Sequence, residues 1–463
     1  MRIGQIAIDV APLRESRDFR WLYSGQMASL AGNMLATTAA NWQVYTLTRS
    51  PLAVGLVTLA DSTGMLIGLL AGGVLADHRD RRQLLSAVRV PQALLAAGLM
   101  VNSLVPHPLL WLIYAVTLAI GLTAGLASPA SSAALPALVG TRRLAAATAL
   151  NSMSRQLATL AGPAIAGWLI AGPGVAACYA TDTVGFIAFG IATRFIRPLP
   201  PQGVTSRPGL RSLGEGFRFV SHSGVLGGIL LVDTSAMIFG MPAGLFPAIA
   251  TEHFHGGPST FGLLTAAPAA GAVLGALTSG WTSHLRRPGL VVIGAGTAWG
   301  GAVIGFGLAP SLAVALLFLA LAGMSDLISE VLRNALLQHY TPDALRGRVS
   351  SLYLAQVTSA PAIGNVEAGA VAQLFSLTVS VVSGGIACVA GALLLGALVP
   401  AVRKATLDPA EPPGLPEPPG LPEPPGLPGL PGSGPGDGSG DGAGDGGPDE
   451  PGGPLQQEGR ITA

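Results

Sequence analysis

Long apolar runs separated by short polar breaks are the feature of this sequence that most constrains its fold. A helix needs about 20 apolar residues to cross the ~30 Å hydrocarbon core of a membrane. Runs near that length cover residues 21–47, 53–76, 84–105, 108–130, 145–171, 174–195, 224–250, 260–283, 289–309, 311–333, 349–373 and 376–400. Only 11% of the 463 residues are charged, whereas soluble domains carry about 25%. The sequence therefore predicts an all-α integral membrane protein with twelve transmembrane helices, and it excludes an ordinary water-soluble enzyme.

The twelve runs fall into two groups of six. The predicted organisation is a cytoplasmic N-terminus (1–20), an N-terminal six-helix bundle (21–195), a cytoplasmic linker (196–223), a C-terminal six-helix bundle (224–400) and a tail (401–463). An internal repeat supports this division, because residues 55–73 and 262–280 share glycines and apolar residues at matching positions, and each is the second run of its group. Two parallel repeats around one central site are typical of secondary transporters.

Arginine placement predicts the orientation. One set of alternate breaks contains Arg79, Arg81, Arg82, Arg142, Arg143, Arg286, Arg287, Arg346 and Arg348, as well as the middle segment 194–218. The opposite set contains Arg49 alone. By the positive-inside rule, both termini and the middle segment are cytoplasmic. Arginine far exceeds lysine, of which Lys404 is the single example, and this bias suggests a GC-rich bacterial genome. We therefore expect a multi-pass protein of a bacterial cytoplasmic (inner) membrane.

The C-terminal tail has a composition unlike the rest of the chain. The hexapeptide Glu-Pro-Pro-Gly-Leu-Pro repeats from Glu411 to Pro428, and Gly/Asp/Ser/Pro repeats follow to about Pro454. Such a composition cannot bury enough apolar surface to fold, so the sequence predicts a disordered acidic cytoplasmic tail.

The break after the second run contains a recognisable motif. Gly73, Asp77, Arg81 and Arg82 match the pattern G-x-x-x-D-[RK]-x-G-[RK]-[RK], although Asp80 replaces its second glycine and His78 its first basic residue. This resembles the signature of the major facilitator superfamily, and the resemblance implies a fold of two pseudo-symmetric six-helix bundles. We interpret the motif as a conformational element whose charge network restrains the rocking of the two halves. The alternative is ordinary positive-inside charge.

A second motif lies in the fifth run. Gly162, Pro163 and Gly167 match g-x-x-x-G-P-x-x-G-G, with Ala158 and Ala166 in place of two glycines. This is similar to the motif of antiporters in that superfamily, where it accompanies export. Small residues and a proline also permit close helix packing and a kink, so a generic helix interface is the alternative.

Within the superfamily, the resemblance narrows to one family. The stretches Ala71–Asp77, Pro136–Gly140, Gly214–Arg218, Ala276–Gly280, Arg287–Leu290 and Thr341–Arg348 resemble the enterobactin (siderophore) exporter family. The resemblance implies a proton-coupled secondary transporter that exports a siderophore from the cytoplasm by alternating access. A broad-specificity multidrug efflux pump of the same superfamily is the alternative.

Ionisable residues inside the apolar runs are the candidate coupling and substrate sites, because a charge at the bilayer centre costs at least about 2.5–3.5 kcal/mol. They are Asp61, Arg155, Asp182, Asp233, Asp326 and Glu330. One interpretation is a proton relay in which a carboxylate takes up a proton as cargo leaves. In the superfamily the first, fourth, seventh and tenth helices line the cavity, which favours Asp233 and Asp326. The alternative is static pairing, either of Asp61 or Asp182 with Arg155 or of Glu330 with Arg333. Arg155 is also a candidate for binding an anionic substrate.

The sequence contains little that indicates enzyme chemistry. The single lysine has no glycine-rich phosphate cradle before it, so a P-loop is excluded. The histidines form no H-E-x-x-H motif; His253 and His255 beside Glu252 could hold a metal, but such a loop is more often without function. We predict a non-enzymatic protein without cofactor or metal. Its predicted partners are a small-molecule substrate, protons and membrane lipid, and no nucleic acid.

Overall fold

The computed structural model describes residues 9–200, 210–240, 242–278, 280 and 285–407. The side chains of Val74, of residues 76–78 and of residues 210–213 lie outside this description. Residues 408–463 of the predicted tail also lie outside it, so the predicted disorder of that part stays a prediction, whereas residues 401–404 are helical. We call residues 9–200 the first half and residues 210–407 the second half.

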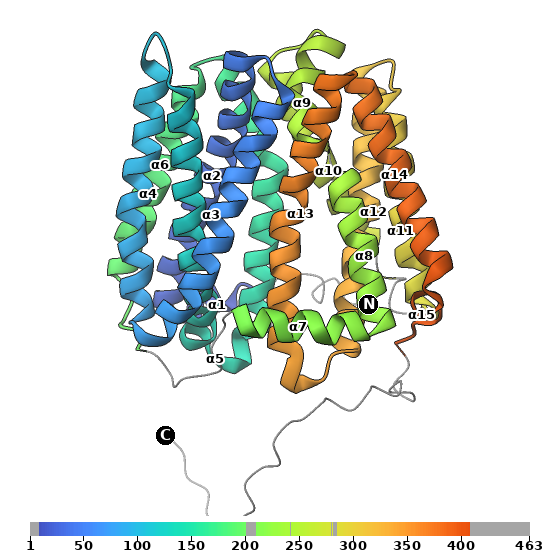
Figure 1. Cartoon of the computed structure of the whole chain (residues 1–463). Helices are drawn as coiled ribbons and strands as arrows, with labels where there is room; N and C mark the ends of the chain where they lie inside the picture. The colour runs from blue at the N-terminus through green and yellow to red at the C-terminus, as the bar shows by residue number, and fades with distance from the viewer. Residues whose placement is uncertain (1–8, 201–209, 241, 279, 281–284, 408–463) are drawn as a thin grey trace, which may run out of the picture. The chain divides into compact units, whose positions relative to one another are not determined.

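The first half is built from α1 to α6 (Figure 1). They are α1 (Ala11–Glu15), α2 (Arg17–Thr48), α3 (Pro51–His78), α4 (Arg81–Leu104), α5 (Leu110–Ala171) and α6 (Val175–Arg194). Side-chain caps set several helix starts, because the first N–H groups of a helix have no partner within it. Ser16 accepts from Phe19 N at 3.1 Å at the start of α2, and Ser50 precedes Pro51 at the start of α3.

Helix α5 contains 62 residues and is divided by a kink at Gly140, which has a φ of 67°. At ~1.5 Å per residue it is far too long for one crossing of a ~30 Å core. The two predicted runs 108–130 and 145–171 lie on either side of this glycine. Glycine adopts the left-handed region without steric cost, which explains the residue type at the kink.

The second half follows a similar order of helices. They are α7 (Leu210–His222), α8 (Gly224–Phe239), η2 (Ala243–Leu245), α9 (Phe246–Ala248), η3 (Ile249–His253), α10 (Pro258–Thr278), α11 (Pro288–Gly307), α12 (Leu312–His339), η5 (Asp343–Leu345), α13 (Arg346–Leu374), α14 (Leu377–Leu398) and α15 (Pro400–Lys404). Figure 1 shows α7 lying crosswise to the long helices. The predicted run 224–250 is not one continuous helix. Helix α8 ends at Phe239 with Gly240 as its C-cap, and Pro242, which follows, cannot donate a helical N–H.

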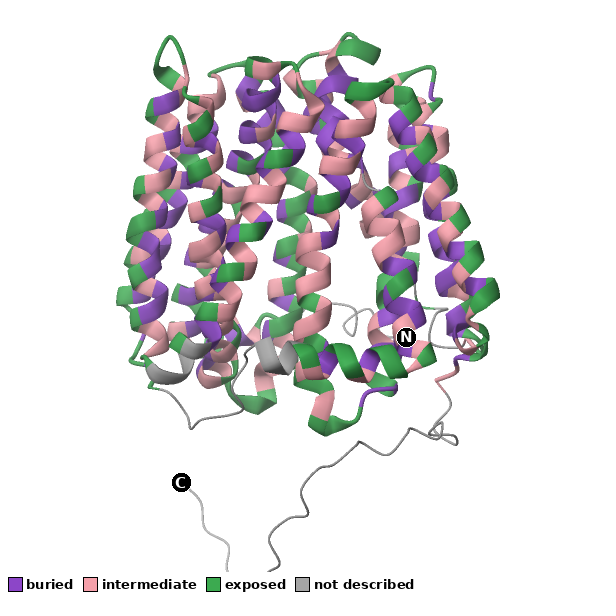
Figure 2. Cartoon of the chain, viewed as in Figure 1, coloured by how far each residue is buried: buried purple, intermediate pink, exposed green. Residues whose placement is uncertain are grey.

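The described chain is an all-α membrane protein. Nine of its helical stretches are long and apolar enough to cross a membrane, with α5 counted once. Helices α2 and α13 are also of spanning length but more polar. The total of twelve spans stays a prediction. Leu94, Trp168 and Leu277 are among the exposed large apolar side chains, as expected of helices that face lipid. Figure 2 shows exposed residues distributed along the long helices.

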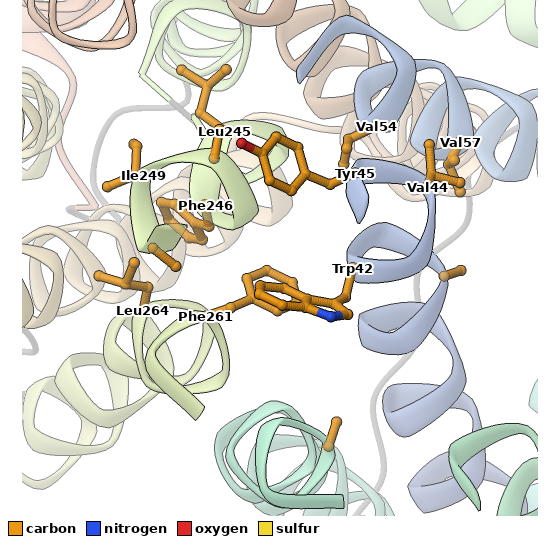
Figure 3. Packing of buried hydrophobic residues seen from close by; sticks show 14 of the residues in the cluster. Trp42, Val44, Tyr45, Val54, Val57, Leu245, Phe246, Ile249, Phe261 and Leu264 are labelled. Atoms are coloured by element: carbon orange, nitrogen blue, oxygen red, sulfur yellow. The ribbon is translucent and has the colours of Figure 1, made fainter. Parts of the chain in front are cut away.

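The buried apolar residues of the described ranges form three clusters, and one of them joins the two halves. This cluster contains Trp42 and Tyr45 of the first half with Leu245, Phe246 and Phe261 of the second. In Figure 3, Trp42 lies over Phe261, with ring centroids 5.7 Å apart. The cluster lies at the end of the bundle that holds the α2–α3 turn. We call this the outer end, after the orientation predicted from the arginines.

Candidate functional site

The central feature of the second half is a buried ion pair between α8 and α12. Arg333 Nη1 lies 2.8 Å from Asp233 Oδ1, and the side chains are 4% and 1% exposed. Arg333 Nη2 also lies 3.6 Å from Asp326 Oδ1, whose side chain is 46% exposed. One guanidinium is therefore shared by a buried and an accessible carboxylate.

Neutral side chains hold this pair in place. The amide nitrogen of Gln356 on α13 donates to Asp233 Oδ2 at 3.0 Å and to the Leu230 carbonyl at 3.2 Å. Arg333 Nη1 donates to Ser329 Oγ at 2.9 Å. Buried charges are tolerated only when they are paired and hydrogen-bonded. Three helices thus converge on Asp233, and we call Asp233, Asp326, Ser329, Arg333 and Gln356 the charge cluster.

The static pair expected between Glu330 and Arg333 is not found among the described residues. Arg333 instead reaches across to α8 and back along α12 to Asp326. Glu330 is exposed, and it interacts electrostatically with Arg155 of the first half without forming an ion pair within 4.0 Å. The sequence spacing placed Glu330 next to Arg333 on one helix, but the interhelical contact with Asp233 is the shorter one.

The remaining candidates lie in the first half, and the structure does not join them to the charge cluster. Asp61 of α3 and Asp182 of α6 line a small cavity together. Arg155 of α5 is exposed and forms no ion pair with either acid in the described chain. Arg89 of α4 interacts electrostatically with Asp182. This arginine is buried, and the sequence analysis did not name it as a candidate. Its position inside an apolar run could have identified it, because a charge in the membrane is costly without a partner.

The loop motif lies where α3 gives way to α4. Arg82 donates to the carbonyls of Thr193 at 3.1 Å and Arg194 at 2.8 Å, at the end of α6. Asp80 accepts from Arg82 N at 2.8 Å and therefore caps α4.

The other three residues of the motif are Arg81, Gly73 and Asp77. Arg81 Nη1 donates to the Ala133 carbonyl at 3.3 Å. Gly73 is buried within α3, and the side chain of Asp77 lies outside the description. The hydrogen-bond partners of both arginines belong to the first half, so in this conformation the described part of the motif ties helices within one half.

The antiporter-like motif lies at close helix contacts. A Cβ on Gly162 would lie 2.6 Å from Met34 Cβ of α2. A Cβ on Gly167 would lie 2.6 Å from the Pro258 carbonyl of α10, and one on Gly262 would lie 2.5 Å from the Pro163 carbonyl. The motif therefore permits backbone contact between the two halves at the outer end.

A polar contact reinforces this outer junction. The hydroxyl of Tyr45 on α2 donates to Glu252 Oε1 of η3, and Thr251 Oγ1 donates to the Tyr45 hydroxyl at 3.1 Å. Helix α3 packs along α13 and α5 along α10, which are also contacts between the halves. His253 Nε2 contacts the Ala309 carbonyl at 3.1 Å. Within the described ranges, no group of three His, Cys, Asp or Glu side chains could hold a metal ion.

Two stretches that carried the family resemblance contact each other on the opposite side. Glu215 of α7 forms an ion pair at 2.9 Å with Arg348 of α13. A Cβ on Gly216 would lie 2.7 Å from the Arg348 carbonyl, so the glycine permits this approach. Helix α7 is thereby attached to the second half.

Solved structures with the same fold are transporters. A POT family transporter in complex with a thioalcohol-conjugated peptide aligns with a TM-score of 0.68 at 13% identity, over 83% of this chain and 96% of that one. A bacterial homologue of the iron transporter ferroportin aligns with a TM-score of 0.63 at 16% identity, over 84% and 99%. The shared fold, together with the match of residues 7–420 to an MFS family model, confirms the major facilitator superfamily that the loop motif predicted.

The sequence comparisons identify the family. Residues 7–420 match the model of the transmembrane secretion effector family. The enterobactin exporter EntS of Citrobacter koseri is 33% identical over 410 residues, which are 88% of this chain and 98% of the relative. EntS of Escherichia coli O81 is 33% identical over 393 residues, or 85% and 93%. The chain belongs to the transmembrane secretion effector family, and it is a multi-pass membrane transporter rather than an enzyme.

Proposed function

We propose that this protein is a proton-coupled exporter of an enterobactin-like siderophore, which works by alternating access in a bacterial cytoplasmic membrane with both termini inside. The observation that carries the proposal is the charge cluster, in which Arg333 is shared by buried Asp233 and accessible Asp326. The similarity to enterobactin exporters over most of the chain supplies the substrate class.

The charge cluster links a proton to the substrate. When both acids are ionised, the cluster carries one net negative charge, and both Nη atoms of Arg333 are paired. In this state the accessible Asp326 carboxylate accepts charge-assisted hydrogen bonds from the catechol hydroxyls of a substrate that enters from the cytoplasm. Protonation of this carboxylate from outside removes the acceptor and releases the substrate, and loss of the proton to the cytoplasm restores the ionised state. The proton and the substrate thereby compete for the same carboxylate, as an exchange of one for the other requires.

The distribution of contacts supports alternating access. The halves meet at the outer end through Trp42, Tyr45 and Gly167, while Asp326 and Arg155 remain accessible. We assign this arrangement to an inward-open state that can admit cargo from the cytoplasm. Arg155 is then an accessible cationic group for anionic oxygens of the substrate. In this proposal the two predicted six-helix bundles, residues 21–195 and 224–400, are the bodies that move relative to each other.

The proposal is tested by deleting the gene and measuring chelator in the spent medium during iron starvation. The expected result is loss of the chelator from the medium and its accumulation in cells, with rescue by the wild-type gene but not by Asp233→Asn. Glu367, an acid on α13 outside the charge cluster, provides the control, and Glu367→Gln should also rescue export. Unchanged chelator together with increased sensitivity to dyes and antibiotics would overturn siderophore export and favour a multidrug efflux pump.

A further inference from the structure

A small cavity inside the first half is lined by acceptor oxygens. It has a volume of about 60 Å³ and lies among α2, α3, α4, α5 and α6, with Asp61, Asp182 and Asn41 in its wall. Pockets for drug-sized ligands are about 300–1,000 Å³. The cavity is therefore too small for the exported substrate but large enough for an ion with one or two waters.

Three buried acceptor atoms of this wall have no hydrogen-bond partner within the described chain. They are both carboxylate oxygens of Asp182 and Oδ1 of Asn41. Asp182 is 0% exposed, so solvent does not reach it. A buried acceptor without a partner costs about 1–3 kcal/mol, and more when it is charged. One proton on Asp182 can serve only one further acceptor, whereas one cation is bound by several oxygens at once.

The ionisable groups around the cavity carry a net charge of one negative unit when they are all ionised. Asp61 and Asp182 form no ion pair with any described side chain within 4.0 Å. Arg89 acts on Asp182 electrostatically, but its Nη1 donates to Gln92 Oε1 at 2.7 Å and its guanidinium lies 4.0 Å from the centre of the Phe189 ring. Two carboxylates and one guanidinium leave one negative charge, which a monovalent cation neutralises and a divalent cation exceeds.

We infer that this cavity is a sodium site, formed by the carboxylates of Asp182 and Asp61 and the amide oxygen of Asn41. Hard cations prefer oxygen ligands of these kinds. Threonine hydroxyls of Thr37, Thr58 and Thr117 line the same cavity and provide neutral oxygens. The site lies within one half and is separate from the charge cluster, so bound sodium stabilises the α2–α3–α6 contact rather than competing with the substrate.

The test is a thermal-unfolding titration of the purified full-length protein in lipid nanodiscs. Sodium chloride is varied against choline chloride at constant ionic strength and pH, and potassium chloride is titrated in parallel. We expect a saturable rise in the unfolding midpoint with sodium only. Asp182→Asn and Asn41→Ala should weaken the apparent sodium affinity at least tenfold, whereas Glu367→Gln, which changes an acid on α13 away from the cavity, should leave it unchanged.

Several outcomes would overturn the sodium site. One is an unfolding midpoint that is the same in sodium and in choline. Another is an Asp182→Asn variant whose apparent sodium affinity equals that of the wild type. A third is stabilisation by acid that does not depend on sodium, which would indicate a proton site. If Asp182→Asn does not fold, direct binding of radiolabelled sodium to the wild type and to Asn41→Ala decides the question. Chelator export by Asp233→Asn cells is a separate readout, so the two proposals can fail independently.

Discussion

The strongest quantitative prediction concerns the ion pair of Asp233 and Arg333. Removing one partner of a buried pair costs about 3–5 kcal/mol, because the other charge is left without compensation. In Asp233→Asn, Arg333 loses the contact with Asp233 at 2.8 Å and keeps the contact with Asp326 at 3.6 Å. Coulomb attraction varies inversely with distance, so roughly two-fifths of the summed attraction to the two acids is retained before screening. We therefore expect a loss near the lower limit, about 3 kcal/mol.

The reverse substitution should cost more. Arg333→Gln leaves Asp233 buried, with the Gln356 amide as its remaining described side-chain partner. The expected loss lies near the upper limit, about 5 kcal/mol. The double variant Asp233→Asn/Arg333→Gln carries no uncompensated charge at this position, so it should be more stable than either single variant. The resulting coupling energy should exceed about 2 kcal/mol, within the upper range for residues in contact.

The assay is denaturant unfolding of the four purified proteins in lipid nanodiscs, which gives a double-mutant cycle. Glu330→Gln is the matched control, because Glu330 is exposed on the same helix and should change stability by no more than about 0.5 kcal/mol. Single-variant losses that add within about 0.5 kcal/mol in the double variant would refute the reasoning.

Three further predictions concern the contacts that hold the helices. Gly262→Leu should prevent close approach of the halves and increase maleimide labelling of outer-end cysteines introduced for the purpose, whereas Gly301→Leu, at a glycine with open space beside it, should not. Tyr45→Phe removes a hydrogen bond to the Glu252 carboxylate and should weaken outer closure by about 1.5–3 kcal/mol; unchanged labelling in the same assay would contradict this. Arg82→Gln removes two bonds to the end of α6 and should lower the unfolding free energy by about 2 kcal/mol, and a change below about 0.5 kcal/mol would count against the motif as a tie between helices.

The helices were largely predictable because the hydrocarbon core demands length and apolarity, and both are visible in a sequence. The run 174–195 corresponds to Val175–Arg194 of α6, for example. The break after α8 and the helix α7 were missed. The first depends on how Gly240 packs, where its carbonyl accepts from Trp299 Nε1 at 2.9 Å, and the second has an amphipathic sequence that the search for apolar spans does not detect.

The candidate site was predictable only in part. The acids inside apolar runs were found from the cost of a charge in lipid. The partner of Arg333 was not, because spacing along α12 indicates neighbours on one helix, whereas Asp233 comes from another. Gln356 carries no charge and gave no signal, although it supplies the hydrogen bond that fixes Asp233. Such contacts depend on how the helices pack against one another, and this packing cannot be read from the order of residues in a single sequence.

The most direct test of the central claim is transport by the purified protein in liposomes. A catecholate siderophore is supplied outside, and its uptake is measured with an acidic lumen and with no pH gradient, for the wild type, Asp233→Asn and Glu367→Gln. We predict accumulation that requires the gradient, persists in Glu367→Gln and is lost in Asp233→Asn. Equal accumulation of the siderophore with and without the pH gradient, or gradient-driven accumulation by Asp233→Asn, would contradict proton-coupled export through the charge cluster.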